Sequence, residues 1–159
     1  MTTPDRSDHD DVPIPSLLRA SRVAYGHAIR GELRGRGIDD MPRNGAAVIG
    51  GMGNHGLQPG VMVRQLGVSK QAASQLIDTL VVRGYLVRET DPEDRRRLKI
   101  SLTNRGQEAA EGVRAAVVAV DQELAEMLGA AGVTGLREGL VALCDIRDRF
   151  EHEHELDTA

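Results

Sequence analysis

Five polar residues near the middle of the chain have types and spacing suited to hydrogen bonding with DNA bases. Gly67 is placed to take a left-handed turn, and Ser69 can cap a helix that begins at about Lys70. In a major groove Gln can bond adenine through two hydrogen bonds, Lys can bond guanine, and Ser can bond several base edges. The candidate base-reading residues are Ser69, Lys70, Gln71, Ser74 and Gln75.

The other face of this predicted helix is apolar. Ala73, Leu76, Ile77 and Leu80 recur at spacings of three and four residues, so they share one side of a helix. Such a helix alone is common in soluble proteins. The segment just before it, closed by Leu66 and Gly67, makes the pair a candidate helix-turn-helix.

Three consecutive arginines, Arg95 to Arg97, follow a predicted turn at residues 91–94. The flanking segments 85–90 and 98–102 alternate apolar and polar residues, which predicts a β-hairpin. Arginines at a hairpin tip add nothing to a core, whereas the narrow minor groove of DNA attracts guanidinium groups. A solvated loop is the alternative for this cluster.

The hairpin segment resembles the MarR-type winged helix-turn-helix regulators, named for multiple antibiotic resistance. The resemblance rests on Asp94-Arg95-Arg96, followed by a strand that ends in Leu102-Thr103, and it extends to residues 67–84. It implies that Asp94 and Arg96 pair to stiffen the wing, that an Arg there enters the minor groove, and that Arg95 shares contacts with the phosphates or the groove. The expected wing residues are Asp94, Arg95, Arg96 and Arg97.

The distribution of charge agrees with a DNA-binding segment in the middle of the chain. The net charge of the whole chain is −4, but residues 61–105 hold nine Lys and Arg against five Asp and Glu. Residues 106–159 hold four against twelve. Because DNA attracts basic patches by releasing counterions, the basic segment is expected to face the duplex and the acidic tail to lie away from it.

Apolar stripes on the terminal segments predict helices that need a partner. The first helix is expected from Leu17 to about Gly35, and a long helix capped by Thr103 or Asn104 is expected to break at residues 129–132 before a last helix. These helices are expected to interlock with a second copy of the chain, which is how the MarR-type family uses its flanking helices, and packing on each other within one chain is the alternative. The expected fold is mainly α with a small β-hairpin wing. The expected divisions are a flexible arm (1–16), an N-terminal dimerisation helix (17–40), a winged helix-turn-helix lobe (41–103), C-terminal dimerisation helices (104–150) and an acidic tail (151–159).

Residues 45–60 contain six glycines where the resembled family has a helix. Each interior Gly costs a helix about 1 kcal/mol relative to Ala, so Gly50 and Gly51 should leave this helix soft or shorten it to about residues 42–52. The run lacks the pattern of a phosphate-binding loop or a dinucleotide fingerprint.

Other residues suggest chemistry less strongly. Cys144 has Asp145 and Asp148 nearby, which disfavour a reactive thiolate, so a structural role is expected. The tail His152 and His154 do not share a helix face, so no metal site is expected. Tyr25 and His27 are candidate residues of an effector pocket between the two lobes that the resemblance implies, with a half-buried structural His27 as the alternative.

The sequence therefore predicts a homodimeric DNA-binding transcription regulator, a ligand-responsive repressor of a palindromic operator. The alternative is an architectural DNA-binding protein of low sequence specificity. Neither a catalytic constellation nor a cofactor motif occurs at a useful spacing, so no enzyme is expected. With 40% apolar residues, one cysteine and no expected signal peptide or membrane span, the chain is expected in the cytoplasm. Its expected partners are double-stranded DNA, a second copy and a small aromatic effector.

Overall fold

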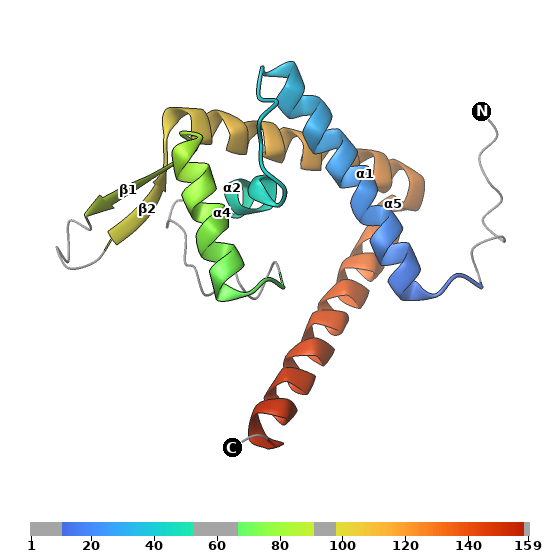
Figure 1. The fold of residues 1–159 in the computed structure, drawn as a ribbon. Coiled ribbons are helices and arrows are strands. Elements are labelled where there is room, and N and C mark those ends of the chain that lie inside the picture. The colour runs from blue at the N-terminus through green and yellow to red at the C-terminus, as the bar shows by residue number, and fades with distance from the viewer. Residues whose placement is uncertain (1–10, 53–66, 91–97, 158–159) are drawn as a thin grey trace. The chain divides into compact units, whose positions relative to one another are not determined.

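The computed structural model describes residues 11–52, 67–90 and 98–157. It is mainly helical with one two-stranded antiparallel sheet, as the sequence predicts (Figure 1). The chain divides into two compact units, residues 1–118 and 119–159, and the division falls inside the last helix. The elements are α1 (Ile14–Gly35), α2 (Gly45–Gly51), α4 (Lys70–Val82), β1 (Leu86–Thr90), β2 (Leu98–Leu102) and α5 (Asn104–Asp157).

Helix α1 begins three residues before the predicted Leu17, because the Pro13 carbonyl accepts the first hydrogen bonds from Ser16 and Leu17. It ends where Gly37 takes a positive φ of 74°. There the amide of Ile38 reaches back to the carbonyl of Leu33 at 2.9 Å. Both of these side chains are buried, so an apolar contact accompanies the helix end.

Helix α2 is only 7 residues long. It starts after Asn44, which is in the left-handed conformation, and Met52 caps its end. The described part of the glycine-rich run thus forms a short helix, one of the two outcomes expected from the sequence. Gly50 also faces a neighbour, because a β-carbon there would lie 2.7 Å from Cγ1 of Val113 on α5.

The two strands pair in antiparallel register from Leu86 opposite Leu102 to Thr90 opposite Leu98. The hairpin therefore lies where the sequence predicts it, with the first strand starting one residue later than Tyr85. Tyr85 and Leu86 are buried, and the strand becomes exposed towards Thr90. The base of the hairpin is anchored in the core and its far end projects from it.

The core of the first unit contains side chains from each of its helices and from the hairpin, among the residues that the structure describes. Its members come from the end of α1, from α2, from one face of α4, from the hairpin base and from the first turns of α5. They are Leu33, Ile38, Val48, Ile49, Met52, Ala73, Ile77, Leu80, Tyr85, Leu86, Ala109, Ala110 and Val113. This core fixes α4 and the hairpin against the start of α5.

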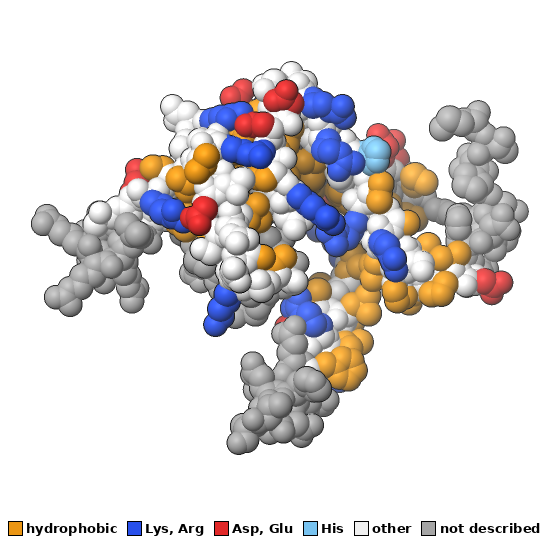
Figure 2. Space-filling view, viewed as in Figure 1, with side chains coloured by type: hydrophobic (Ala, Val, Ile, Leu, Met, Phe, Trp, Pro, Cys, Tyr) orange, Lys and Arg blue, Asp and Glu red, His pale blue; other side chains and the backbone are white. Residues whose placement is uncertain are grey.

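Helix α5 changes character along its length. At Gly129 the backbone leaves the helical conformation (φ 70°, ψ 169°), which is the predicted break. Beyond Ala116, none of the side chains up to residue 150 is buried. Figure 2 shows apolar side chains along the C-terminal half of this helix.

By length and apolar composition alone, part of α5 (Asn104–Phe150) could also cross a membrane. Core helices of soluble proteins can have the same length and composition, so this feature does not by itself assign a membrane span.

Candidate nucleic-acid interface

The start of helix α4 has the geometry that the sequence predicts. Gly67 adopts a positive φ of 60°, and Ser69 has extended backbone angles. The Ser69 hydroxyl accepts a hydrogen bond from the amide of Ala72 at 3.1 Å. This side-chain cap fixes the first turn of α4, which begins at Lys70.

Helix α4 presents one buried and one exposed face. Ala73, Ile77 and Leu80 are buried in the core, and Leu76 packs against it. The opposite face carries polar side chains that take no part in the core, so they are available for hydrogen bonds with base edges. All five predicted residues are exposed on it: Ser69, Lys70, Gln71, Ser74 and Gln75.

An ion pair between Asp78 and Arg88 links α4 to the hairpin. The guanidinium of Arg88 on β1 donates to the carboxylate of Asp78, and both side chains are about half exposed. The pair ties the outer face of α4 to the first strand of the wing. The sequence does not identify this pair, because the two residues belong to different elements.

The predicted wing residues Asp94, Arg95, Arg96 and Arg97 lie outside the described residues. The last described pair of the hairpin is Thr90 opposite Leu98, immediately on either side of that segment. The roles of these four residues in the wing rest on the resemblance to MarR-type regulators and stay predictions.

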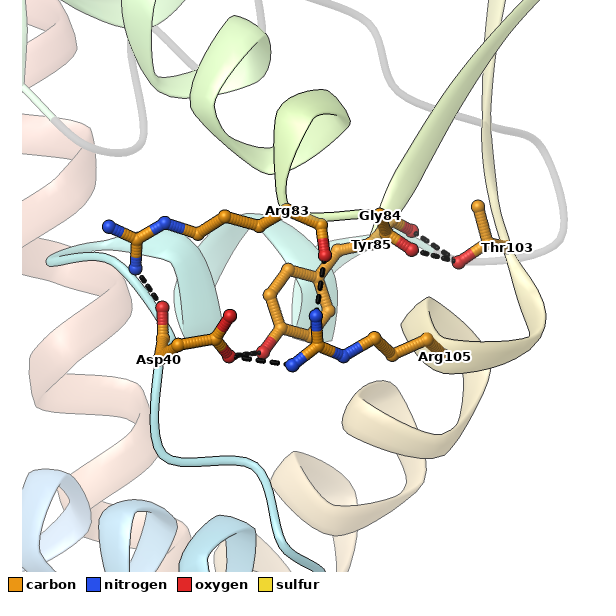
Figure 3. A network of polar contacts seen from close by, with 6 residues as sticks. All are labelled: Asp40, Arg83, Gly84, Tyr85, Thr103 and Arg105. Carbon is orange, nitrogen blue, oxygen red and sulfur yellow. Dashed lines mark hydrogen bonds and ion pairs between the residues drawn. The ribbon is translucent and has the colours of Figure 1, made fainter.

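A polar cluster joins the α1–α2 link, the end of α4 and the start of α5 (Figure 3). We call Asp40, Arg83, Tyr85 and Arg105 the junction cluster. One carboxylate oxygen of Asp40 accepts hydrogen bonds from the Tyr85 hydroxyl and, at 2.8 Å, from the Arg105 guanidinium. The backbone carbonyl of Asp40 accepts a further bond from the Arg83 guanidinium.

Arg105 makes three contacts within the junction cluster. Besides Asp40, its guanidinium donates to the carbonyl of Arg83 at 2.6 Å. Its central carbon lies 4.4 Å from the centre of the Tyr85 ring, within the range of a cation–π interaction. The planar guanidinium therefore bonds in its plane and stacks through its face.

The junction cluster perturbs the ionisation of two of its members. The hydrogen bond from Tyr85, followed by the charge of Arg105, holds the pKa of the Asp40 carboxyl below its usual range against the opposing effect of burial. Burial of the phenol and its bond to Asp40 raise the pKa of Tyr85 to about 12. Both shifts favour the protonation states in which the Tyr85 hydroxyl donates to a charged Asp40.

Thr103 fastens the second strand to the same place. Its hydroxyl lies 2.5 Å from the carbonyl of Gly84, to which it donates, and it accepts a bond from the amide of Gly106 at 3.0 Å. Its amide donates to the carbonyl of Tyr85 at 3.1 Å. Thr103 therefore caps α5, one of the two predicted capping choices, and closes the base of the hairpin.

The junction cluster was missed in the sequence because its members are 43 to 65 residues away from Asp40. A partial signal is present. Tyr85 follows Gly84, a glycine with positive φ at the end of α4, and immediately precedes β1. Its side chain is buried, and a buried tyrosine hydroxyl needs a hydrogen-bond partner. Nothing local identifies Asp40 rather than Asp39 as that partner.

The candidate effector residues Tyr25 and His27 both lie on α1. In the single chain Tyr25 is partly buried and His27 is exposed. The assignment of both residues to an effector pocket stays a prediction. Cys144 is also exposed. Among the side chains that the structure describes, no three His, Cys, Asp or Glu residues gather as metal ligands would.

Known proteins are similar to this chain in the segment that contains α4 and the hairpin. Residues 39–97 match the sequence model of the MarR family. Over 107 residues the chain is 28% identical to the transcriptional repressor MprA of Escherichia coli (strain K12), a match that covers 64% of this chain and 61% of MprA. The chain thus spans less than two thirds of this relative.

Solved structures share the fold at low sequence identity. The crystal structure of MarR matches with a TM-score of 0.68 and 22% identity, covering 96% of this chain and 99% of MarR. FabT of Streptococcus pneumoniae, solved in complex with DNA, matches at 0.68 and 18%, covering 86% and 96%. CouR of Rhodococcus jostii, solved with bound p-coumaroyl-CoA, matches at 0.64 and 23%, covering 87% and 95%.

Proposed function

We propose that this chain, which belongs to the MarR family of winged helix-turn-helix regulators, binds double-stranded DNA and represses transcription. The observation that carries the proposal is the exposed face of α4, where Lys70, Gln71 and Gln75 project from a helix whose other face is locked in the core. A rigid helix of this kind can present its side chains to a major groove. The repressor MprA, which matches over 107 residues, supports the direction of regulation.

The wing would add contacts that do not depend on sequence. The sequence places Arg95 and Arg96 between β1 and β2, and those strands are held by Thr103 and by the ion pair between Asp78 and Arg88. From that position, guanidinium groups can reach phosphates or the minor groove. FabT, which shares the fold, was solved with DNA.

We further propose that the working form is a homodimer. After Ala116, α5 buries none of its side chains up to residue 150, although helices in proteins depend on packing an apolar face. Leu136, Leu140, Leu143 and Phe150 recur at spacings of four, three and seven residues and are all exposed. A second copy would cover this stripe and would place two recognition helices for a palindromic operator, about 34 Å apart.

A small aromatic effector is the third part of the proposal. CouR, which shares the fold, was solved with p-coumaroyl-CoA, an aromatic acyl thioester. Tyr25 and His27 on α1 are the candidate contact residues, and a phenolic acid is a suitable first ligand to try. Binding of such a ligand would lower the affinity for DNA. In this proposal the protein catalyses no reaction and acts inside the cell, where its DNA is.

Recovery of DNA from the protein's own genome tests the proposal. Fragmented genomic DNA is incubated with the purified chain, and the retained fragments are sequenced. We expect a small set of fragments that share a palindrome. Broad retention without a shared sequence would favour the architectural alternative, and no retention would contradict DNA binding altogether.

A matched pair of variants separates specific from general effects. Gln75→Ala removes a side chain from the proposed reading face, and Gln122→Ala removes the same side chain from an exposed position on α5. Only Gln75→Ala should change which fragments are retained. If both variants recovered the wild-type set, Gln75 would not read bases.

A further inference from the structure

We propose that Asp40 is a positioning residue for DNA binding, which holds the base of the wing at a fixed angle through Tyr85 and Arg105 without touching DNA. This inference rests on the proposed DNA-binding function and adds a residue in the link between α1 and α2. Neither the sequence motif nor the exposed face of α4 includes it.

Asp40 brings together three segments that are distant in sequence. Its carboxylate binds Tyr85, which immediately precedes β1, and Arg105 in the first turn of α5, while its carbonyl binds Arg83 at the end of α4 (Figure 3). Asp40 is the one acid among the six residues drawn there. Two guanidinium groups and a phenol are therefore organised around a single side chain and its backbone.

The guanidinium of Arg105 fixes the orientation of Tyr85 relative to Asp40. It stacks over the Tyr85 ring while it donates to the carboxylate of Asp40 and to the carbonyl of Arg83 (Figure 3). A guanidinium provides several donors in one plane and a flat face, which a lysine ammonium lacks. Without the carboxylate, Arg105 would lose one of its two bonded partners and Tyr85 would lose its acceptor.

The position of Tyr85 determines where the wing points. Tyr85 is fully buried and its carbonyl accepts the amide of Thr103, so it belongs to both the core and the hairpin base. The strand from Leu86 to Thr90 extends roughly 17 Å from that base, at about 3.3 Å per residue. A rotation of about 10° at Tyr85 would therefore move the wing by roughly 3 Å, enough to misplace a groove contact.

Simple electrostatics predicts the opposite effect of removing Asp40. Deleting a negative charge from a DNA-binding unit should strengthen attraction to phosphates. The positioning role predicts weaker binding instead, because the wing loses its fixed angle. The neighbouring Asp39, which is exposed, supplies a matched control with the same charge change.

The experiment measures binding of fluorescently labelled operator DNA, recovered as described above, by anisotropy at several salt concentrations. Asp40→Ala should lower the affinity roughly tenfold and flatten the salt slope, because a misplaced wing loses contacts with the phosphates. Asp40→Asn, which keeps an acceptor for Tyr85, should restore part of the affinity. Asp39→Ala should bind as well as the wild type or slightly better.

Tyr85→Phe keeps the buried ring and removes only the hydroxyl, so it tests the same link if Asp40→Ala fails to fold. It should also weaken binding, and combining it with Asp40→Asn should cost less than the sum of the two single effects. Hydrogen exchange should speed up at the amides of β1 and β2 but not at those in the middle of α4.

Different results would reject the two proposals separately. If the wild type binds no duplex, the proposed function fails. If the wild type binds while Asp40→Ala and Tyr85→Phe bind equally well with unchanged hairpin exchange, the positioning role is wrong and DNA binding stands. Tighter binding by Asp40→Ala than by the wild type would also overturn positioning, since removal of a negative charge would then be the dominant effect.

Discussion

A β-carbon on Gly106 would lie 2.0 Å from the carbonyl oxygen of Tyr85. The first turn of α5 thus touches the backbone at the base of the wing, at a separation that only glycine permits. The same turn carries Arg105 and is capped by Thr103. The close approach of Gly106 is therefore what allows the junction cluster to form.

Gly106→Ala should destabilise the first unit by at least about 2 kcal/mol, because the atom it meets is backbone and cannot rotate away. Urea unfolding at a fixed protein concentration measures the change. Gly31→Ala is the control, since nothing lies within 4 Å of a β-carbon there and the change should stabilise α1 by up to about 1 kcal/mol. Equal stability of Gly106→Ala and the wild type would contradict the close approach.

Alkaline pH should destabilise the protein through Tyr85. Its pKa is raised to about 12 in the folded chain, so the folded state favours the protonated phenol. That contribution is complete below a pH of about 10, the usual value, and is lost as the pH rises towards 12. The chain has two tyrosines and no tryptophan, so phenolate absorbance in a Tyr25→Phe variant reports Tyr85 alone. A midpoint near 10 in the folded protein would refute the assignment.

The sequence predicted those parts of the fold that depend on local patterns. The turn at Gly67, the cap at Ser69, the two faces of α4 and the break at Gly129 are each set by a residue and its near neighbours, and the structure confirms all four. The start of α1 was wrong by three residues, because Pro13 ends the arm with a carbonyl that can accept helical bonds.

The junction cluster could not be predicted in the same way. Asp40 meets Tyr85 and Arg105 only after the core has placed α5 beside the α1–α2 link, and the Gly106 approach that permits this is a long-range contact. Likewise, the charge pattern indicated which segment is basic, but not that Asp78 would pair with Arg88. Tertiary packing decides such pairs.

Leu140→Glu should convert the proposed dimer to a monomer, because it introduces a charge into the exposed apolar stripe of α5. Light scattering at micromolar concentration measures the mass. Ala142→Glu adds the same charge about half a turn away on the same helix and should leave the dimer intact. A monomeric wild type would contradict both the dimer and the paired half-sites.

Gly51→Ala tests whether the glycine-rich segment takes part in effector coupling. Gly51 has open space around a β-carbon, whereas Gly50→Ala would push against Val113, so Gly51 is the clean position. Calorimetric titration of a phenolic acid with and without operator should show weaker ligand binding when DNA is present. Gly51→Ala should change the ratio of the ligand affinities measured with and without operator. Identical ligand affinities with and without DNA would mean that the ligand does not regulate binding.

If the exposed face of α4 reads bases, the affinity for DNA must depend on the base pairs that this face contacts. The affinity of the chain for the recovered operator is compared with its affinity for single base-pair variants of that operator, for the wild type and for Gln71→Ala. The wild type should lose about 1 to 3 kcal/mol at particular base pairs, and Gln71→Ala should lose that preference at one of them. Equal affinity of the wild type for every variant would contradict the account, since the chain would then bind DNA without reading it.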